Sequence, residues 1–124
     1  MIVLDTSVLI RYFARDDKVK AEKAKLLLET GKELVIPDAV LPEIEYVLSK
    51  SSKAKRAELI KAFIFLNSLH NISLTKEARE AIAIFKNSKL DMADCIVAAY
   101  SMKGSLASFD KDLLGIAGIN PFWK

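Results

Sequence analysis

The first ten residues, MIVLDTSVLI (1–10), contain the pattern that decides the fold. Three apolar residues, Ile2 to Leu4, are followed by Asp5 and, after two hydroxyl residues, by a second apolar run, Val8 to Ile10. A short apolar run predicts a buried strand, and an acid or hydroxyl directly before apolar residues is typical of a helix N-cap. The stretch therefore predicts a strand that ends at Asp5 and passes at once into a helix.

The same alternation of short apolar runs and helical periodicity continues along the chain. Further strands are expected at 34–36, 72–74, 106–109 and 119–123. Apolar spacings of three and four residues predict helices at 19–29, 39–49, 54–69, 75–88 and 91–102. Strands that alternate with helices indicate an α/β fold with a mainly parallel sheet. We expect one domain over residues 1–124, because no repeat, low-complexity tract or linker interrupts the pattern.

The composition excludes several classes of function. The single cysteine, Cys95, and the single histidine, His70, exclude an internal disulfide framework, a structural zinc site and a two-histidine ribonuclease mechanism. Neither phosphate-binding glycine motif, G-x-x-x-x-G-K-[ST] or G-x-G-x-x-G, is present. We expect a cytoplasmic protein with no targeting leader, and no apolar run reaches the roughly 18 residues of a membrane span.

Carboxylates stand at positions where a folding domain rarely needs them. Asp5 and Asp110 each follow a predicted strand, so both should lie at the carboxyl edge of a parallel sheet, where α/β folds build their sites. Asp91 and Asp94 are three residues apart at a helix start and therefore point to the same side. Each of these acids can also be explained as a helix N-cap or an exposed first-turn residue.

Glu43 lies in LPEIEYVL (41–48), near the start of a predicted helix, where it and Glu45 can equally be surface acids. The argument for a site is that acids from several different elements should converge on one edge of the sheet. Oxygen ligands without His or Cys select hard cations, so the expected cofactor is Mg²⁺ or Mn²⁺.

Four segments, in this order and spacing, resemble the PIN-domain nucleases and, among them, the VapC-like toxins of bacterial and archaeal toxin–antitoxin pairs. The segments are VLDTSVLI (3–10), LPEIEYVL (41–48), DMADCIVAA (91–99) and ASFDKDL (107–113). The resemblance covers nearly the whole chain. It implies a three-layer α/β/α domain with a central parallel sheet of four or five strands.

The resemblance also implies a role for each acid. The family's acidic quartet maps onto Asp5, Glu43, Asp94 and Asp110. In the family this quartet holds divalent metal and hydrolyses RNA phosphodiester bonds. Asp91 matches a less strict acid, while Thr6 and Ser108 match hydroxyl positions beside the first and last acids and are expected to orient the acids. Relatives more often carry Thr where this chain has Ser108, and Ser keeps the hydroxyl.

The charge distribution favours a polyanionic substrate such as RNA. The formal net charge is +3, and when the five candidate acids are set aside, 11 acidic residues remain against 19 basic ones. The candidate phosphate contacts are Arg11, Arg15 and Lys18. Solvated lysine-rich helix faces are also common, so this second interpretation stays open.

Two protein partners follow from the resemblance, a cognate antitoxin that covers the acidic site and a second copy in a homodimer. The sequence itself shows more large aromatics than one small core needs, and we expect most of them in the core. These aromatics are Tyr12, Phe13, Phe63, Phe65 and Trp123.

Three other functions stay open. A haloacid-dehalogenase-type phosphatase also places an Asp after its first strand. That chemistry needs the motif D-x-D, and here Ser7 occupies the place of the second Asp. A phospho-acceptor receiver domain needs an Asp after the third strand, where this chain has Leu74 and Thr75. A non-catalytic PIN-like binding scaffold would differ only in lacking cleavage, so an RNA cleavage assay separates it from a nuclease.

Overall fold

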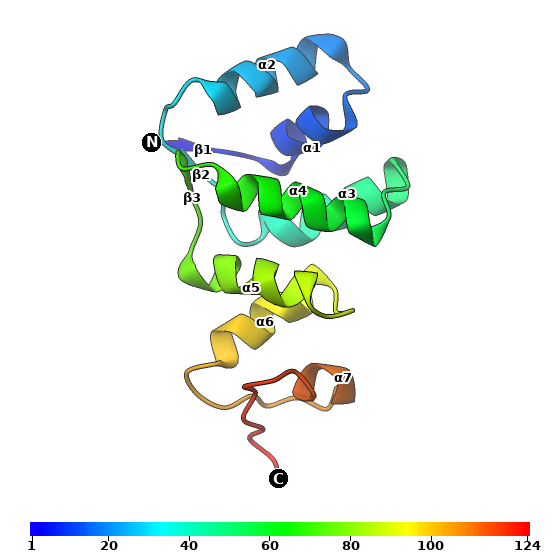
Figure 1. The fold of residues 1–124 in the computed structure, drawn as a ribbon, viewed down its shortest axis with the longest axis vertical. Helices are drawn as coiled ribbons and strands as arrows, with labels where there is room; N and C mark the ends of the chain where they lie inside the picture. The colour runs from blue at the N-terminus through cyan, green and yellow to red at the C-terminus, as the bar shows by residue number, and fades with distance from the viewer. The chain divides into compact units, whose positions relative to one another are not determined.

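The computed structural model describes all residues from Met1 to Lys124. The chain forms two compact units, Met1–Thr75 and Lys76–Lys124 (Figure 1). The first unit contains β1 (Ile2–Val3), α1 (Thr6–Ala14), α2 (Lys18–Glu29), β2 (Leu34–Val35), α3 (Val40–Ser51), α4 (Arg56–Ser68) and β3 (Ile72–Ser73). The second unit contains α5 (Lys76–Lys86), α6 (Met92–Ser101) and α7 (Lys111–Leu114).

The sheet of the first unit is parallel, with strand order β1-β2-β3. Ile2 lies opposite Leu34, and Leu34 lies opposite Ile72. Main-chain hydrogen bonds continue the pairing of β1 and β2 past the ends of the strands. The Leu4 N–H donates to the carbonyl of Val35 at 2.8 Å. Parallel pairing puts the residues after each strand at one edge, and Asp5 follows β1 there.

The sheet has three strands, although the sequence predicted more. Segments 106–109 and 119–123 were expected to be strands, and they are joined to each other by an isolated bridge between Leu106 and Pro121. The Leu106 N–H donates to Asn120 O, and the Phe122 N–H donates to Leu106 O, both at 2.8 Å. No further main-chain hydrogen bond joins the two segments, so the pairing ends after one bridge.

Aspartates begin four of the helices, and this confirms the simpler explanation of three candidate acids. The side chains of Asp5, Asp17, Asp91 and Asp110 each accept a hydrogen bond from a backbone N–H in the first turn of the following helix. Such bonds satisfy N–H groups that have no partner within the helix. The predicted helices are all present, with ends displaced by one or two residues.

The core of the first unit surrounds the central strand. Leu34 in β2, Leu41 and Ile44 in α3, and Phe63 in α4 are all fully buried. Tyr12, Phe13 and Phe65 are half-buried in a cluster in which the rings of Tyr12 and Phe65 stack at 5.5 Å. Most of the aromatics expected in the core are thus buried or half-buried, and Trp123 is the exception, at 54% exposed.

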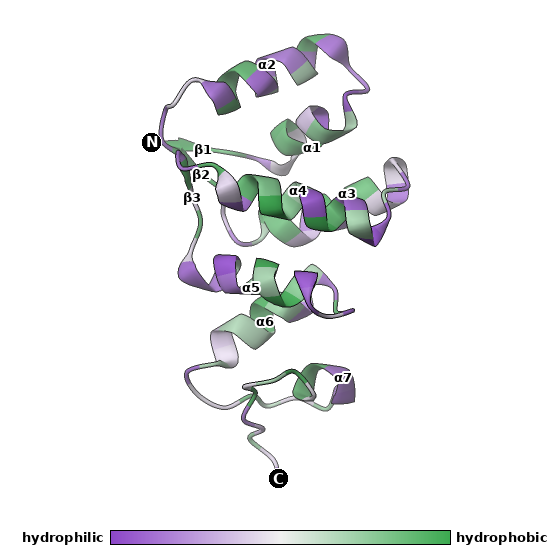
Figure 2. Ribbon diagram, in the orientation of Figure 1, coloured by the Kyte–Doolittle hydropathy of each residue, from purple (hydrophilic) through white to green (hydrophobic).

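The second unit packs around α6. Met92, Cys95, Ala98 and Ala99 of this helix are buried. Ala98 forms a small core with Leu106 and Leu113. Figure 2 shows α6 mainly in white and green, whereas α2 alternates between purple and green as an amphipathic surface helix does. No helix in the chain combines the length and the hydropathy needed to cross a bilayer.

Candidate functional site

A cleft in the first unit holds two of the candidate acids. Its volume is about 460 Å³, and Asp5, Thr6 and Glu43 line it together with Arg11 and Asp16. The end of β1 supplies Asp5, and the first turn of α3 supplies Glu43. Proline is tolerated in that turn, so Pro42 does not interrupt the helix that carries Glu43. The structure thus brings together Asp5 and Glu43, which lie 38 positions apart in the sequence.

Hydroxyl groups orient both candidate acids of the cleft, Asp5 and Glu43. Thr6, which is buried, donates a hydrogen bond from Oγ1 to Glu43 Oε1 at 3.2 Å. Ser7 donates twice to Asp5 Oδ2, from its backbone N at 3.1 Å and from its Oγ at 2.6 Å. The Ser7 side chain, followed by its backbone N–H, lowers the pKa of Asp5. Asp5 is therefore held as a carboxylate.

Three acids of the second unit influence one another. Burial raises the pKa of the partly buried Asp94, and the negative charges of Asp91 and Asp110 raise it further. Asp91 Oδ1 accepts from the Asp94 N–H at 2.8 Å. Asp110 Oδ1 accepts from the backbone N–H groups of Asp112 and Leu113 at 2.9 and 3.2 Å. A bound cation would relieve the mutual repulsion of these three carboxylates.

The caps do not exclude a role as metal ligands. A carboxylate has two oxygens with about four acceptor positions in total. In Asp5, Asp91 and Asp110 the capping bonds fall on a single oxygen, Oδ2 in Asp5 and Oδ1 in the other two. The capping bond fixes the side-chain rotamer, and the second oxygen can face a cation.

Ser108 acts on the backbone and not on a carboxylate. Its Oγ accepts a hydrogen bond from the Asp110 N–H at 3.0 Å, which orders the turn that leads into α7. Its predicted position beside the last acid therefore corresponds to a contact with the main chain of that acid.

The donor set fits a hard cation, while the structure itself describes only parts of a complete site. All candidate ligands are carboxylate oxygens, the ligands that Mg²⁺ and Mn²⁺ prefer. No group of three or more His, Cys, Asp or Glu side chains is arranged to hold a metal ion. Asp5 and Glu43 belong to the first unit, and Asp94 and Asp110 belong to the second. The quartet as a whole stays a prediction.

The three basic residues predicted to contact phosphate have different surroundings. Arg11 lines the cleft and forms an ion pair with Asp16, with 3.0 Å between Nη1 and Oδ1. Arg15 ends α1 in the left-handed region, at φ 53°, and its guanidinium lies 5.3 Å from the centre of the Tyr12 ring. Lys18 is exposed at the start of α2. Only Arg11 lies beside candidate acids.

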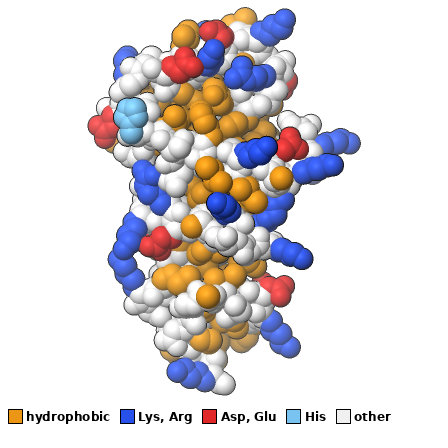
Figure 3. All heavy atoms as spheres, viewed as in Figure 1, with side chains coloured by type: hydrophobic (Ala, Val, Ile, Leu, Met, Phe, Trp, Pro, Cys, Tyr) orange, Lys and Arg blue, Asp and Glu red, His pale blue; other side chains and the backbone are white.

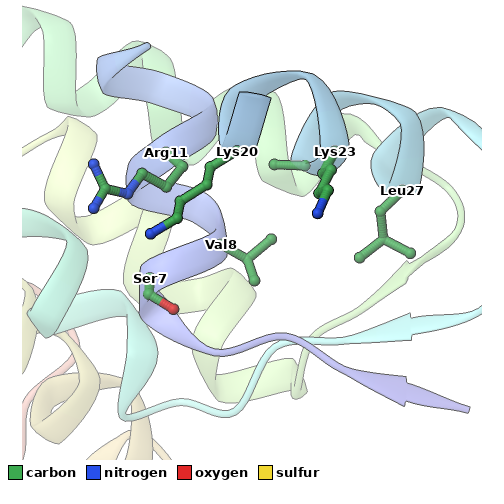
Figure 4. A pocket seen from close by; sticks show the side chains of 7 residues that line it. Ser7, Val8, Arg11, Lys20, Lys23 and Leu27 are labelled. Atoms are coloured by element: carbon green, nitrogen blue, oxygen red, sulfur yellow. The ribbon is translucent and has the colours of Figure 1, made fainter. Parts of the chain in front are cut away.

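A second groove lies between α1 and α2. Figure 4 shows Val8 and Leu27 facing its interior, while Arg11, Lys20 and Lys23 surround it with positive charge. Its volume is about 350 Å³. This groove has an apolar floor and a cationic rim.

Sequence reasoning missed two polar residues of the cleft. Ser7 bonds directly to Asp5, and the available signal was its position two residues after an acid, where local hydrogen bonds to the side chain are common. Asp16 lines the cleft and pairs with Arg11. The position of Asp16 depends on where α1 ends. No local sequence pattern indicates that the Asp16 side chain lines the cleft.

For the RNA cleavage that the resemblance implies, the substitution Thr6→Val should reduce the rate roughly 10- to 100-fold while leaving the fold intact, because Glu43 loses the hydroxyl that orients it. The measurement is the initial cleavage rate together with a circular dichroism melting curve. Thr6→Ser keeps the hydroxyl and should restore most of the activity. Equal rates for the valine and serine variants would show that the bond from Thr6 to Glu43 has no role in activity.

Comparisons with known proteins agree with the expected resemblance. No solved structure matches the chain significantly. A protein of Aquifex aeolicus (strain VF5) described as a VapC ribonuclease is 26% identical over 133 residues, an alignment that covers 98% of both chains. Residues 2–119 match the family model described as "PIN domain", which confirms the three-layer α/β/α fold class. Because that match covers nearly the whole length of the chain, the chain belongs to the PIN-domain family.

Proposed function

We propose that this protein is an endoribonuclease that depends on Mg²⁺ or Mn²⁺ and is the toxin of a type II toxin–antitoxin pair. The observation that carries the proposal is the arrangement of the acids. In each unit, hydrogen bonds from neighbouring groups hold carboxylates in fixed positions at helix starts. The end-to-end similarity to a protein named VapC ribonuclease supports RNA as the substrate.

Four acids would hold the cation, and their neighbours would keep them in position. The proposed ligands are Asp5, Glu43, Asp94 and Asp110. When bound, the cation supplies an activated nucleophile near neutral pH and stabilises negative charge at the reacting phosphate. Thr6 orients Glu43, and Ser7 keeps Asp5 ionised. Asp91 caps the helix that carries Asp94.

Arg11 in the cleft and basic groups elsewhere on the surface support a phosphate-containing substrate. Figure 3 shows Lys and Arg side chains projecting from the visible face in both units. Arg11 is placed to contact a phosphate once that phosphate competes with Asp16 for its guanidinium. Arg15 and Lys18 are proposed as weaker, non-specific contacts that add mainly charge.

The remaining parts of the proposal concern organisation and partners. We propose that residues 1–124 act as one catalytic domain, since the family model spans both units. The proposed partners are RNA, a cognate antitoxin and a second copy of the chain. The expected cytoplasmic location stays a prediction.

Removal of metal should abolish cleavage. The purified protein, mixed with single-stranded and structured RNA in millimolar Mg²⁺ or Mn²⁺, should give products that stop forming when EDTA is added and form again when excess Mn²⁺ is supplied. Gel electrophoresis of end-labelled RNA measures this directly. Undiminished cleavage in EDTA would contradict metal dependence. Binding without cleavage in either metal would favour the scaffold alternative.

A further inference from the structure

The C-terminal segment presents an exposed aromatic surface, which we name the aromatic platform and define as Phe109, Phe122 and Trp123. The side chains of these residues are 88%, 61% and 54% exposed, respectively. The rings of Phe109 and Trp123 stack with centres 4.8 Å apart and planes only 8° from parallel. Phe122 meets Trp123 edge-on at 5.5 Å. The three rings thus form one continuous aromatic surface.

Main-chain hydrogen bonds hold the platform in place. The Phe122 N–H donates to Leu106 O, so the residues before Trp123 are fixed beside the segment that leads to Phe109. Leu106 itself is buried, and it anchors this segment to the core of the second unit. Two aromatic rings 14 positions apart therefore meet on a backbone that is already ordered.

Such a surface is costly in water, because exposed aromatic area loses the favourable transfer free energy of burial. Its surroundings indicate the chemistry of what would cover it. Phe109 directly precedes Asp110, one of the proposed acids. In the sequence, the exposed residues Lys111 and Lys124 lie within two positions of the stacked pair, and the exposed acid Asp112 follows Lys111. Flat aromatic faces beside positive charge suit a strand that carries both bases and phosphates.

We propose that the aromatic platform stacks bases of the single-stranded RNA substrate next to Asp110. This inference rests on the proposed function and adds a binding surface to it. A base would lie on the outer face of Phe109 or Trp123 and extend the stack that the two rings begin. Lys111 and Lys124 would contact the neighbouring phosphates.

The chain's only tryptophan is part of the platform, so its fluorescence reports directly on stacking. In EDTA, where the proposed cleavage is off, titration of the full-length protein with single-stranded oligouridylate or oligoadenylate should quench the emission of Trp123 to saturation. An oligoribonucleotide of equal length with abasic sites keeps the phosphates and lacks the rings. It should bind more weakly and leave the emission nearly unchanged.

Substitutions test the affinity, measured by fluorescence anisotropy of labelled RNA. Phe109→Ala should weaken binding roughly tenfold, and Trp123→Phe, which keeps an aromatic ring, should weaken it less. Tyr100→Ala is the matched control, since Tyr100 belongs to the same unit and is 55% exposed, close to the value for Trp123. It should bind RNA as the native protein does.

Several outcomes would overturn the proposal. One is quenching that is equal for abasic and normal RNA, and another is unchanged affinity in Phe109→Ala. A third is loss of self-association in Phe109→Ala, seen by sedimentation, with RNA affinity retained, because the platform would then belong to a second copy. If the native protein cleaves RNA and Phe109→Ala binds RNA with unchanged affinity, the proposed role of the aromatic platform is contradicted and the proposed function is not. Quenching without cleavage in Mg²⁺ or Mn²⁺ contradicts the proposed function alone.

Discussion

The Asp94→Asn variant should lose at least about a hundredfold of its RNA cleavage rate and at the same time melt at a higher temperature than the native protein. The loss follows from removing a proposed metal ligand. Mutating residues that only orient such ligands already lowers metal affinity or activity roughly 10- to 100-fold, so losing the ligand itself should cost at least as much. The gain in stability follows from the raised pKa of Asp94, whose charge is disfavoured by burial and by the neighbouring acids.

The stability gain should depend on pH. Because the folded-state pKa of Asp94 lies above its unfolded value, the native protein carries no penalty when this carboxyl is protonated in both states. The penalty develops as the pH rises through the folded pKa. The two melting temperatures should therefore differ at neutral pH and converge under acidic conditions.

Controls separate the site from general charge effects. Asp112→Asn removes an exposed acid of α7 that is outside the quartet and should leave cleavage unchanged. Millimolar Mg²⁺ should raise the melting temperature of the native protein more than that of Asp94→Asn, because the ion binds the folded state. Full cleavage by Asp94→Asn, or equal Mg²⁺ shifts for the two proteins, would count against the metal site.

The Phe63→Ala variant should lower the free energy of unfolding by about 3–5 kcal/mol. Phe63 is fully buried on the inner side of α4, so its removal leaves a cavity as well as losing hydrophobic burial. The free energy of unfolding of a folded domain is only about 5–15 kcal/mol in total, so this single substitution removes a large share of the stability. Urea denaturation followed by circular dichroism measures the difference.

Two further variants check the cavity explanation. Phe63→Leu keeps much of the volume and should have a smaller effect than the alanine variant. Leu26→Ala shortens a side chain of α2 that is 55% exposed, and we expect a change within about 0.5 kcal/mol. If Phe63→Ala were no worse than Leu26→Ala, the packing described for the first unit would be wrong.

Local signals in the sequence were sufficient to predict the helices. The caps Asp5, Asp91 and Asp110 act on backbone groups two or three residues away, so sequence spacing alone reveals them. The strands near the C-terminus were harder to predict, because their apolar residues fit a strand equally well with or without a partner. The two segments form a single bridge, and no local residue pattern sets how far the pairing extends.

The candidate site shows the same difference between features set by neighbouring residues and features set by residues far apart in the sequence. The count of one His and one Cys is what points to carboxylates as ligands, and this stays a prediction. The bond from Thr6 to Glu43 joins residues 37 positions apart, and no local pattern encodes it. The exposure of Trp123 could not be predicted for a related reason, since hydropathy predicts burial and does not identify the apolar residues that stay at the surface.

The helix-capping role of three aspartates, two of which are also proposed metal ligands, bears on how this protein could evolve. Alanine at position 5, 91 or 110 would remove a charge and also weaken the start of a helix, whereas asparagine caps about as well as aspartate. A descendant under selection to lose the proposed cleavage activity would therefore tolerate asparagine at these positions more readily than alanine. Inactive homologues with asparagine there would be the expected trace of such selection.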